Sequence, residues 1–113
     1  MKSMSYAAVS AAVALAITLS AASRAVYAEA ATGLALAQRM NCMSCHSITR
    51  PFMGPALHDV AVKYAGHEDA AAYLKRKILD GSTGVWGTVP MPANTQLTPD
   101  QAATLAAWVL TLK

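Results

Sequence analysis

The feature that most constrains this chain is a five-residue stretch, Cys42-Met43-Ser44-Cys45-His46, because it holds both cysteines of the chain. The two thiols stand three residues apart, and a histidine directly follows the second. This spacing gathers three reactive or metal-ligating side chains on a very short piece of backbone. Whatever group they hold must fit inside the rest of the fold, so the fold class depends on what this stretch binds.

The first 28 residues are predicted to be a secretory signal peptide. Lys2 lies in a short basic start, residues 6–19 form an apolar run, and small residues precede an expected cleavage after Ala28. The run is shorter than the about 20 apolar residues of a membrane span, so we expect cleavage and no stable membrane insertion. An uncleaved membrane anchor is the alternative. The predicted organisation is a cleaved signal over residues 1–28 and one domain over residues 29–113.

The expected mature chain is small and nearly neutral. Lys2 and Arg24 leave with the signal, so seven of the nine Lys and Arg remain against six Asp and Glu. No basic run with interleaved aromatic residues is present, which argues against a nucleic-acid partner. Domains of this size usually need a disulfide, a metal or another added core component. A Cys42–Cys45 disulfide would close a very short loop and contribute little, so we expect a different component to fill the core.

Apolar periodicity predicts helices and no strands, and therefore an all-α domain. Helices are expected over residues 33–41, 56–64 and 69–80, with Gly81 ending the third. A fourth should begin at Thr98, where Pro99 takes the first helical position and Gln101 completes a capping box. Between the last two helices lies a long segment rich in Gly and Pro, residues 81–97. Loops of this length in a small domain are usually functional or wrap a ligand.

The opening stretch has the form C-x-x-C-H, which is typical of c-type haem attachment. Two cysteines three apart at a helix end can reach the two vinyl-derived carbons on one side of a porphyrin. His46 then lies under the ring centre, where it can ligate the iron. A structural zinc site needs four ligands, usually in paired motifs, and the chain has no second cysteine pair. A thioredoxin-like redox pair needs a βαβ pattern, which is absent. The pattern therefore favours covalent haem.

An iron ligated by His46 requires a second axial ligand from far along the chain, and the candidates are His58, His67, Met53 and Met91. Met91 is favoured because Pro90 and Pro92 flank it and hold its backbone extended. A flexible thioether needs such restraint to act as a haem ligand. His/Met ligation raises the reduction potential relative to bis-histidine and leaves no open position for a substrate. The expected role is one-electron transfer, with no enzyme activity.

Four segments, in this order, resemble the small class I bacterial cytochromes c: CMSCH, MGPAL, DGSTGVWGTVPMPAN and AATLAAWVL. The similarity covers essentially the whole predicted mature chain. It implies a class I cytochrome c fold, with about four helices wrapped around one covalently attached haem c. It also implies that Cys42 and Cys45 form the thioethers, and that His46 and Met91 are the proximal and distal iron ligands.

The same resemblance implies supporting roles for other residues. The Pro55 carbonyl would accept a hydrogen bond from the proximal histidine, which would orient the ring. Trp86 would donate its indole N–H to a haem propionate, with simple core packing as the alternative. Asn94 would lie near the ligand sulfur, and a basic residue, Lys77 or Arg76, near the propionates. In one departure from the family pattern, Ala93 stands where many members carry a second proline.

The chain looks in particular like the short periplasmic cytochromes that donate electrons to nitrite reductases or terminal oxidases. The resemblance therefore implies a monomeric, periplasmic electron carrier of respiration. Its donor would be a membrane cytochrome complex, and its acceptor a nitrite reductase or a terminal oxidase. Two other classes stay open: a haem-based sensor, in which Met91 leaves the iron, and a haem subunit of a larger redox enzyme.

Overall fold

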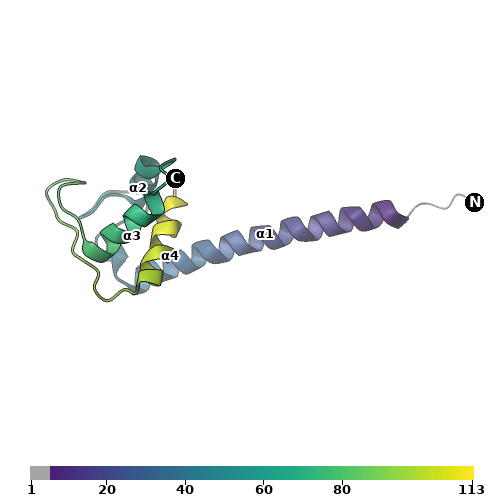
Figure 1. Ribbon diagram of the computed structural model, residues 1–113, viewed down its shortest axis with the longest axis horizontal. Coiled ribbons are helices and arrows are strands. Elements are labelled where there is room, and N and C mark those ends of the chain that lie inside the picture. Colours follow the sequence, from purple (N-terminus) through teal and green to yellow (C-terminus); the bar gives the residue numbers. More distant parts are fainter. Residues whose placement is uncertain (1–5) are drawn as a thin grey trace, which may run out of the picture.

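The computed structural model describes residues 6–113, which form four α-helices and one short 3₁₀ helix (Figure 1). The α-helices are α1 (Tyr6–Arg39), α2 (Leu57–Tyr64), α3 (Ala70–Asp80) and α4 (Pro99–Leu110), and the 3₁₀ helix is η1 (Cys42–Ser44). No strand is present in this range, where an isolated antiparallel bridge pairs Ser82 with Met91. The all-α prediction is confirmed.

Helix α1 is much longer than the helix predicted over residues 33–41. It continues without a break through the predicted cleavage position and projects away from the other helices (Figure 1). The extension follows from an alanine-rich sequence, because alanine has the highest helix propensity. The C-terminal end comes earlier than predicted, since Asn41 adopts a left-handed conformation with φ of 65°.

The structure bears on the signal prediction only in part. The basic start, residues 1–5, lies outside the described residues. Within residues 6–113, no helix combines the length and the apolar character needed to cross a membrane.

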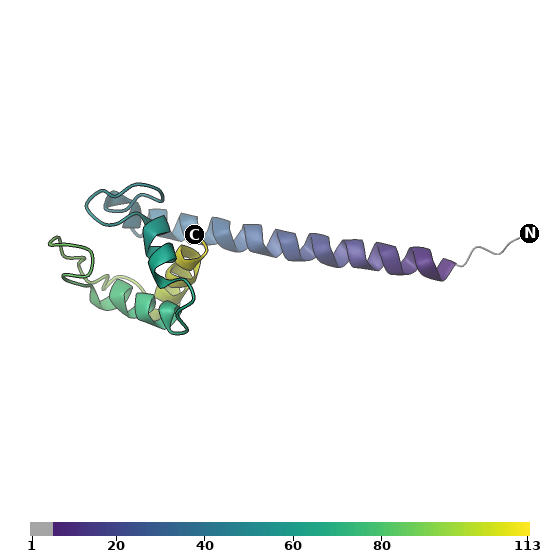
Figure 2. The same ribbon diagram turned by 90° about the horizontal axis from the view of Figure 1, so that it is seen from above.

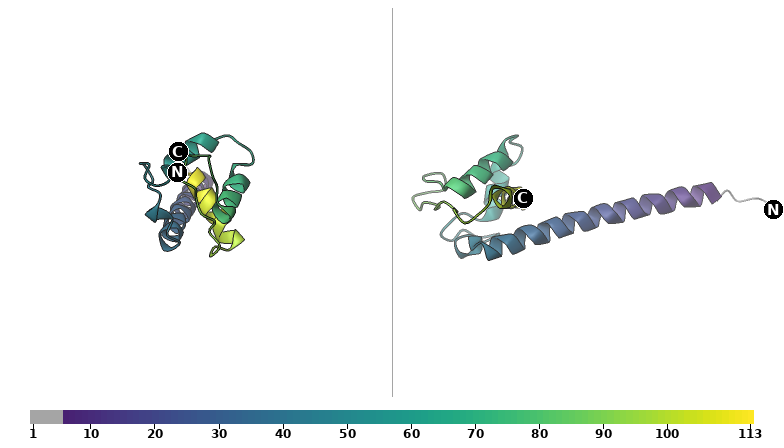
Figure 3. Two further views of the ribbon diagram at one scale, coloured as in Figure 1. Left: turned by 90° about the vertical axis from the view of Figure 1, so that its left-hand side faces the viewer. Right: turned by 60° about the horizontal axis from the view of Figure 1, so that its bottom comes forward.

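Helix α4 lies at the centre of the domain and contacts each of the other three α-helices (Figure 3). It begins with the predicted capping box. The Gln101 backbone N–H donates to the Thr98 hydroxyl over 3.2 Å, and the Thr98 backbone N–H donates to the Gln101 side-chain oxygen over 3.0 Å. The buried core around α4 draws on every helix: Leu36, Ala37, Leu57, Val60, Leu74, Leu97, Leu105, Ala106, Trp108 and Val109.

The contact between α1 and α4 depends on Gly33. A Cβ atom at this position would lie 2.2 Å from Cγ of Trp108, far inside van der Waals contact. Trp108 is only 5% exposed, so its ring has little room to move away. The missing side chain at Gly33 therefore lets the indole pack directly on the α1 backbone.

Two loops carry the predicted site residues, one between η1 and α2 and one between α3 and α4. Both lie at the end of the molecule opposite the projecting half of α1 (Figure 2). Gly81 ends α3, as predicted, with φ of 77°. It also permits a close backbone approach, because a Cβ atom there would lie 2.5 Å from the Met91 carbonyl oxygen. The end of α3 and the segment around Met91 are thereby held together.

Candidate functional site

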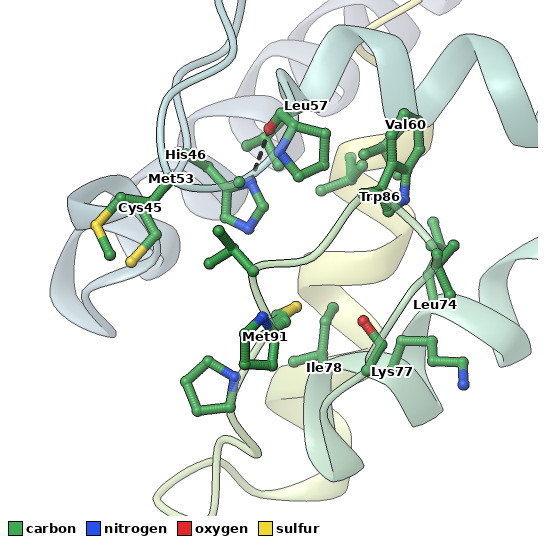
Figure 4. A pocket seen from close by; sticks show the side chains of 18 of the residues that line it. Cys45, His46, Met53, Leu57, Val60, Leu74, Lys77, Ile78, Trp86 and Met91 are labelled. Atoms are coloured by element: carbon green, nitrogen blue, oxygen red, sulfur yellow. Dashed lines mark hydrogen bonds between the residues drawn. The ribbon is translucent and has the colours of Figure 1, made fainter.

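A cavity of about 240 Å³ lies between the two loops and helices α2 and α3. Its lining is mostly apolar, and it includes five of the seven predicted site residues: Cys45, His46, Pro55, Trp86 and Met91 (Figure 4). Cys45 and Met91 stand 46 positions apart in the sequence. The fold therefore brings the C-x-x-C-H stretch and the proline-flanked methionine to one cavity.

His46 is fixed by its own loop. Its Nδ1 lies 2.8 Å from the Pro55 carbonyl oxygen, and a carbonyl can only accept, so Nδ1 carries the proton and donates (Figure 4). In this tautomer Nε2 carries no proton, and its lone pair can bind a metal. Gly54 packs against the ring, since a Cβ atom there would lie 2.6 Å from Cε1 of His46. Pro55 thus supports His46 in the way the sequence predicts.

The two cysteines sit on the tight turn that precedes His46. The backbone N–H groups of Cys45 and His46 both donate to the Cys42 carbonyl, over 3.2 and 3.0 Å. Cys45 lines the cavity, while Cys42 packs against the edge of the core. Neither is in a disulfide. Burial raises the pKa of the Cys42 thiol above its ordinary value.

Met91 is held on both sides by backbone hydrogen bonds. Its N–H donates to the Ser82 carbonyl over 2.9 Å, and the Ser82 N–H donates to the Met91 carbonyl over 3.0 Å. Asn94 does not line the cavity. Its side-chain amide donates to the Ile78 carbonyl over 2.9 Å, and its backbone N–H reaches the same oxygen over 3.2 Å. Asn94 therefore anchors the segment after Met91 to the last turn of α3.

The other candidate ligands for the second axial position are less well placed than Met91. His58 and His67 are exposed and do not line the cavity. His58 Nδ1 instead lies 2.8 Å from the Leu112 carbonyl oxygen. Met53 does line the cavity, but it belongs to the same loop as His46 and is 55% exposed. Only Met91 approaches from the second loop.

One end of the cavity is lined by aromatic side chains and a cation. Trp86, Tyr64, Tyr73 and Lys77 all contribute to it, whereas Arg76 is exposed and does not. The structure thus brings Lys77, rather than Arg76, to the cavity. Burial, a hydrogen bond with Tyr73 and the charge of Tyr73, in that order, raise the pKa of Tyr64 to about 12.

Sequence reasoning missed three of the residues that shape this site. Lys63 places its Nζ 4.6 Å from the centre of the Trp86 ring, and Tyr64 and Tyr73 pair across two helices with ring centres 5.1 Å apart. No periodicity links residues on separate helices, so no sequence signal marked these contacts. The packing of Gly54 on His46 was also missed, although a glycine directly before the supporting proline was a usable signal.

The site fits a haem. It combines an apolar cavity, a nitrogen lone pair at His46, a thioether at Met91 and two unpaired thiols beside the histidine. Haem iron accepts such nitrogen and thioether ligands. In contrast, residues 6–113 contain no cluster of three or more His, Cys, Asp and Glu residues that could hold a metal ion alone. The zinc alternative therefore has no support in the described part of the chain.

Comparisons with known proteins point to one family. The family model for cytochrome c matches residues 30–113. Cytochrome c-552 of Nitrosomonas europaea is 51% identical over 78 residues, which cover 69% of this chain and 76% of the relative. Cytochrome c-551 of Ectopseudomonas mendocina is 52% identical over 83 residues, or 74% of this chain and 100% of the relative.

Similarity extends to the fold. The crystal structure of the wild-type Nitrosomonas europaea cytochrome c552 superposes with a TM-score of 0.70 at 50% identity, covering 71% of this chain and 99% of the other. The chain therefore belongs to the cytochrome c family, as a small class I monohaem electron carrier with covalently attached haem c.

Proposed function

We propose that this chain is a periplasmic one-electron carrier whose haem iron is ligated by His46 and Met91, and that it is not an enzyme. The observation that carries the proposal is the placement of both side chains on one cavity, each held by hydrogen bonds of its own loop. When bound, the haem supplies an iron that changes by one electron. The chain supplies two ligands, which leave no position open for a substrate.

The chain also keeps its ligands in place during the change of oxidation state. His46 cannot rotate without losing its hydrogen bond to Pro55 and colliding with Gly54. The paired hydrogen bonds to Ser82 fix the backbone of Met91, from which the thioether reaches the cavity. A thioether ligand and an apolar lining both favour the reduced iron, so the reduction potential lies above that of a bis-histidine site.

Contact with redox partners takes place at the mouth of the cavity. Met53 and Val89 line it and remain 55% and 58% exposed, and the neighbouring Phe52 is 72% exposed. An exposed apolar rim of this kind suits the small, transient interfaces of electron-transfer proteins. The chain acts as a monomer in the periplasm after cleavage behind Ala28. A membrane cytochrome complex reduces it, and a nitrite reductase or a terminal oxidase oxidises it.

Replacement of Met91 tests the ligand assignment. In Met91→Ala, the weak red absorption band of an iron–thioether bond disappears and the reduction potential falls, because a stabiliser of reduced iron is lost. The matched control is Met53→Ala, which removes the other cavity-lining methionine and leaves the band intact. Persistence of the band in Met91→Ala, or its loss in Met53→Ala, would contradict the assignment.

The role as a carrier is tested separately with the unmodified protein. Purified reduced protein should be oxidised with multiple turnovers by a nitrite reductase or a terminal oxidase. It should bind carbon monoxide poorly at neutral pH, since Met91 occupies the position that the gas would need. Ready binding of carbon monoxide to the reduced protein would instead favour a haem-based sensor.

A further inference from the structure

The tip of the second loop, residues 83–90, has very little to hold it in place. Hydrogen bonds fix the segments on both sides of it, at Ser82 with Met91 and at Asn94 with Ile78. Among the described residues, no hydrogen bond involves any residue from 83 to 90. Gly84 and Gly87, with φ of 75° and 110°, add backbone freedom inside it. A side chain must therefore position this tip.

Trp86 is the side chain that can do so. It lines the cavity and is 40% exposed, so one part of the ring covers the cavity and the other faces solvent. Val60 of α2 lines the same cavity (Figure 4). The Lys63 Nζ, from the last turn of α2, lies 4.6 Å from the ring centre, which is within cation–π range.

The lysine is in turn well fixed at its base. Helix α2 is anchored in the core through Leu57, Val60 and Ala61. The Lys63 Nζ also lies 5.9 Å from the Tyr64 ring, at the outer limit of cation–π range. Among the described residues no carboxylate forms an ion pair with Lys63, although Asp59 stands four residues earlier on the same helix. The ammonium group is thus available to Trp86.

We propose that Lys63 is a positioning residue: its cation–π contact holds Trp86, and with it the loop tip before Met91, closed over the cavity. This inference rests on the proposed function in one respect, since Met91 is the ligand whose release the closed tip opposes. The contact joins the two sides of the site. Helix α2 follows the loop that orients His46, and Trp86 belongs to the loop that carries Met91.

The expected effect is modest and measurable. A cation–π contact at a partly exposed ring changes an equilibrium by about two- to fivefold. If loop opening limits the entry of an outside ligand to ferric iron, losing the contact raises the rate by that factor. Imidazole is the probe, because the neutral molecule is insensitive to a change in surface charge.

The experiment uses ferric holoprotein and follows imidazole binding by stopped-flow absorbance. Lys63→Met, which removes the charge and keeps the apolar stem, should bind imidazole about two- to fivefold faster. Lys63→Arg, which keeps a cation, should restore the original rate. Lys75→Met on α3 is the matched control, since it makes the same charge change at a lysine that has no cation–π contact in the described part of the chain, and it should leave the rate unchanged.

The pairing itself is tested in a Trp86→Leu background. There, Lys63→Met should have no further effect on the rate. If the same acceleration persists without the indole, Lys63 acts through another group, such as a haem carboxylate, and the inference is wrong.

A second measurement does not depend on Met91. In reduced protein, the NMR order parameter of the Trp86 indole N–H should fall in Lys63→Met, while that of the buried Trp108 stays unchanged. An unchanged Trp86 order parameter overturns the inference whatever ligand the iron has. Absence of the red band in the unmodified protein would instead refute the proposed function, and the order parameter would still decide the role of Lys63.

Discussion

His46 owes its orientation to two neighbours in its own loop, one attractive and one steric. The Pro55 carbonyl accepts the Nδ1 proton at 2.8 Å, and the bare Cα of Gly54 lies against the ring. A hydrogen bond of this kind raises the basicity of a metal-ligating histidine and fixes its ring plane. The loop therefore sets both the position and the basicity of the imidazole that we propose as the iron ligand.

Gly54→Ala should disturb both properties at once. The new methyl group would lie 2.6 Å from Cε1 of His46, so the ring or the loop must shift and the bond to Pro55 weakens. Overpacking of this kind costs about 1–3 kcal/mol. The reduction potential should rise, because a less basic histidine stabilises ferric iron less. Guanidinium unfolding and a redox titration measure the two effects.

Gly66→Ala provides the control for Gly54→Ala. Gly66 has φ of 78° and no atom within 4 Å of an added Cβ, so alanine there strains the backbone without touching the site. It should lower stability and leave the potential unchanged. An unaltered potential in Gly54→Ala would mean that the glycine does not control the histidine.

Tyr64 predicts a pH dependence of stability at alkaline pH. Burial and then Tyr73 raise its pKa from 10.0 to about 12 in the folded chain. A raised pKa means that the folded state holds the proton more tightly than the unfolded state. The stabilisation is fully present below pH 10 and is lost as the pH rises through about 12. NMR titration of ring-labelled tyrosine should show this, and Tyr73→Phe should bring the pKa of Tyr64 closer to its ordinary value.

At the scale of the elements, the contact between α1 and α4 depends on Gly33 packing against Trp108. Gly33→Ala sets two effects against each other. Alanine improves helix propensity by about 1 kcal/mol, but its Cβ would overlap the Cβ and two ring atoms of the buried Trp108 side chain. Overpacking costs about 1–3 kcal/mol, so we expect a net loss of stability in denaturant unfolding. The loss should be smaller in a Trp108→Leu background, and equal losses in both backgrounds would contradict the steric explanation.

The helices show which parts of a fold a sequence can predict. The start of α4 was predicted correctly because Thr98, Pro99 and Gln101 act within one turn, and their hydrogen bonds are local. Gly81 ended α3 as expected for the same reason. The length of α1 was not predicted, since its alanine-rich part was interpreted only as a targeting segment. Helix capping could be predicted from the sequence because it is local. The contact of Gly33 with Trp108 could not be predicted, because the two residues stand 75 positions apart.

At the scale of the whole molecule, the free energy of unfolding depends on whether the cavity is filled. Its mostly apolar lining contributes to stability only when an apolar group covers it, because burial is worth about 25 cal/mol per Å² of apolar surface. The net stability of a small domain is only about 5–15 kcal/mol. The haem therefore completes the core, as the small size of the predicted mature chain already indicated.

Removing both cysteines should therefore affect folding as well as haem content. Cys42→Ala with Cys45→Ala should retain no haem under denaturing conditions, and the haem-free chain should lose its cooperative thermal transition in circular dichroism. Intact mass of the unmodified exported protein is the reference, and it should correspond to residues 29–113 plus one haem. Haem retained by the double variant would contradict thioether attachment, and a sharp transition without haem would contradict the role of the haem in the core.

The site as a whole was more predictable than the packing around it. Short motifs marked most of the site residues, because the spacing of the cysteines and the flanking prolines are local features of the sequence. The structure then shows that five of these residues line one cavity: Cys45, His46, Pro55, Trp86 and Met91. The position of Asn94 near the sulfur stays a prediction, and the structure adds that its side-chain amide donates to the Ile78 carbonyl. The Lys63–Trp86 contact joins two segments 23 positions apart, and only the packed structure could show it.

The bond between His58 and the Leu112 carbonyl has a consequence for the path of folding. Counted from His46, the imidazoles of His58 and His67 stand 12 and 21 residues away, and the Met91 sulfur stands 45 away. Because closure probability falls as about the 3/2 power of loop length, an unfolded chain brings His58 to the His46 region roughly sevenfold more often than Met91. If His46 and Met91 are the iron ligands, we expect His58 to compete with Met91 for the iron during refolding of the holoprotein, and refolding should show a slow phase. In the folded chain, His58 Nδ1 lies 2.8 Å from the Leu112 carbonyl oxygen, and this contact keeps the imidazole away from the cavity.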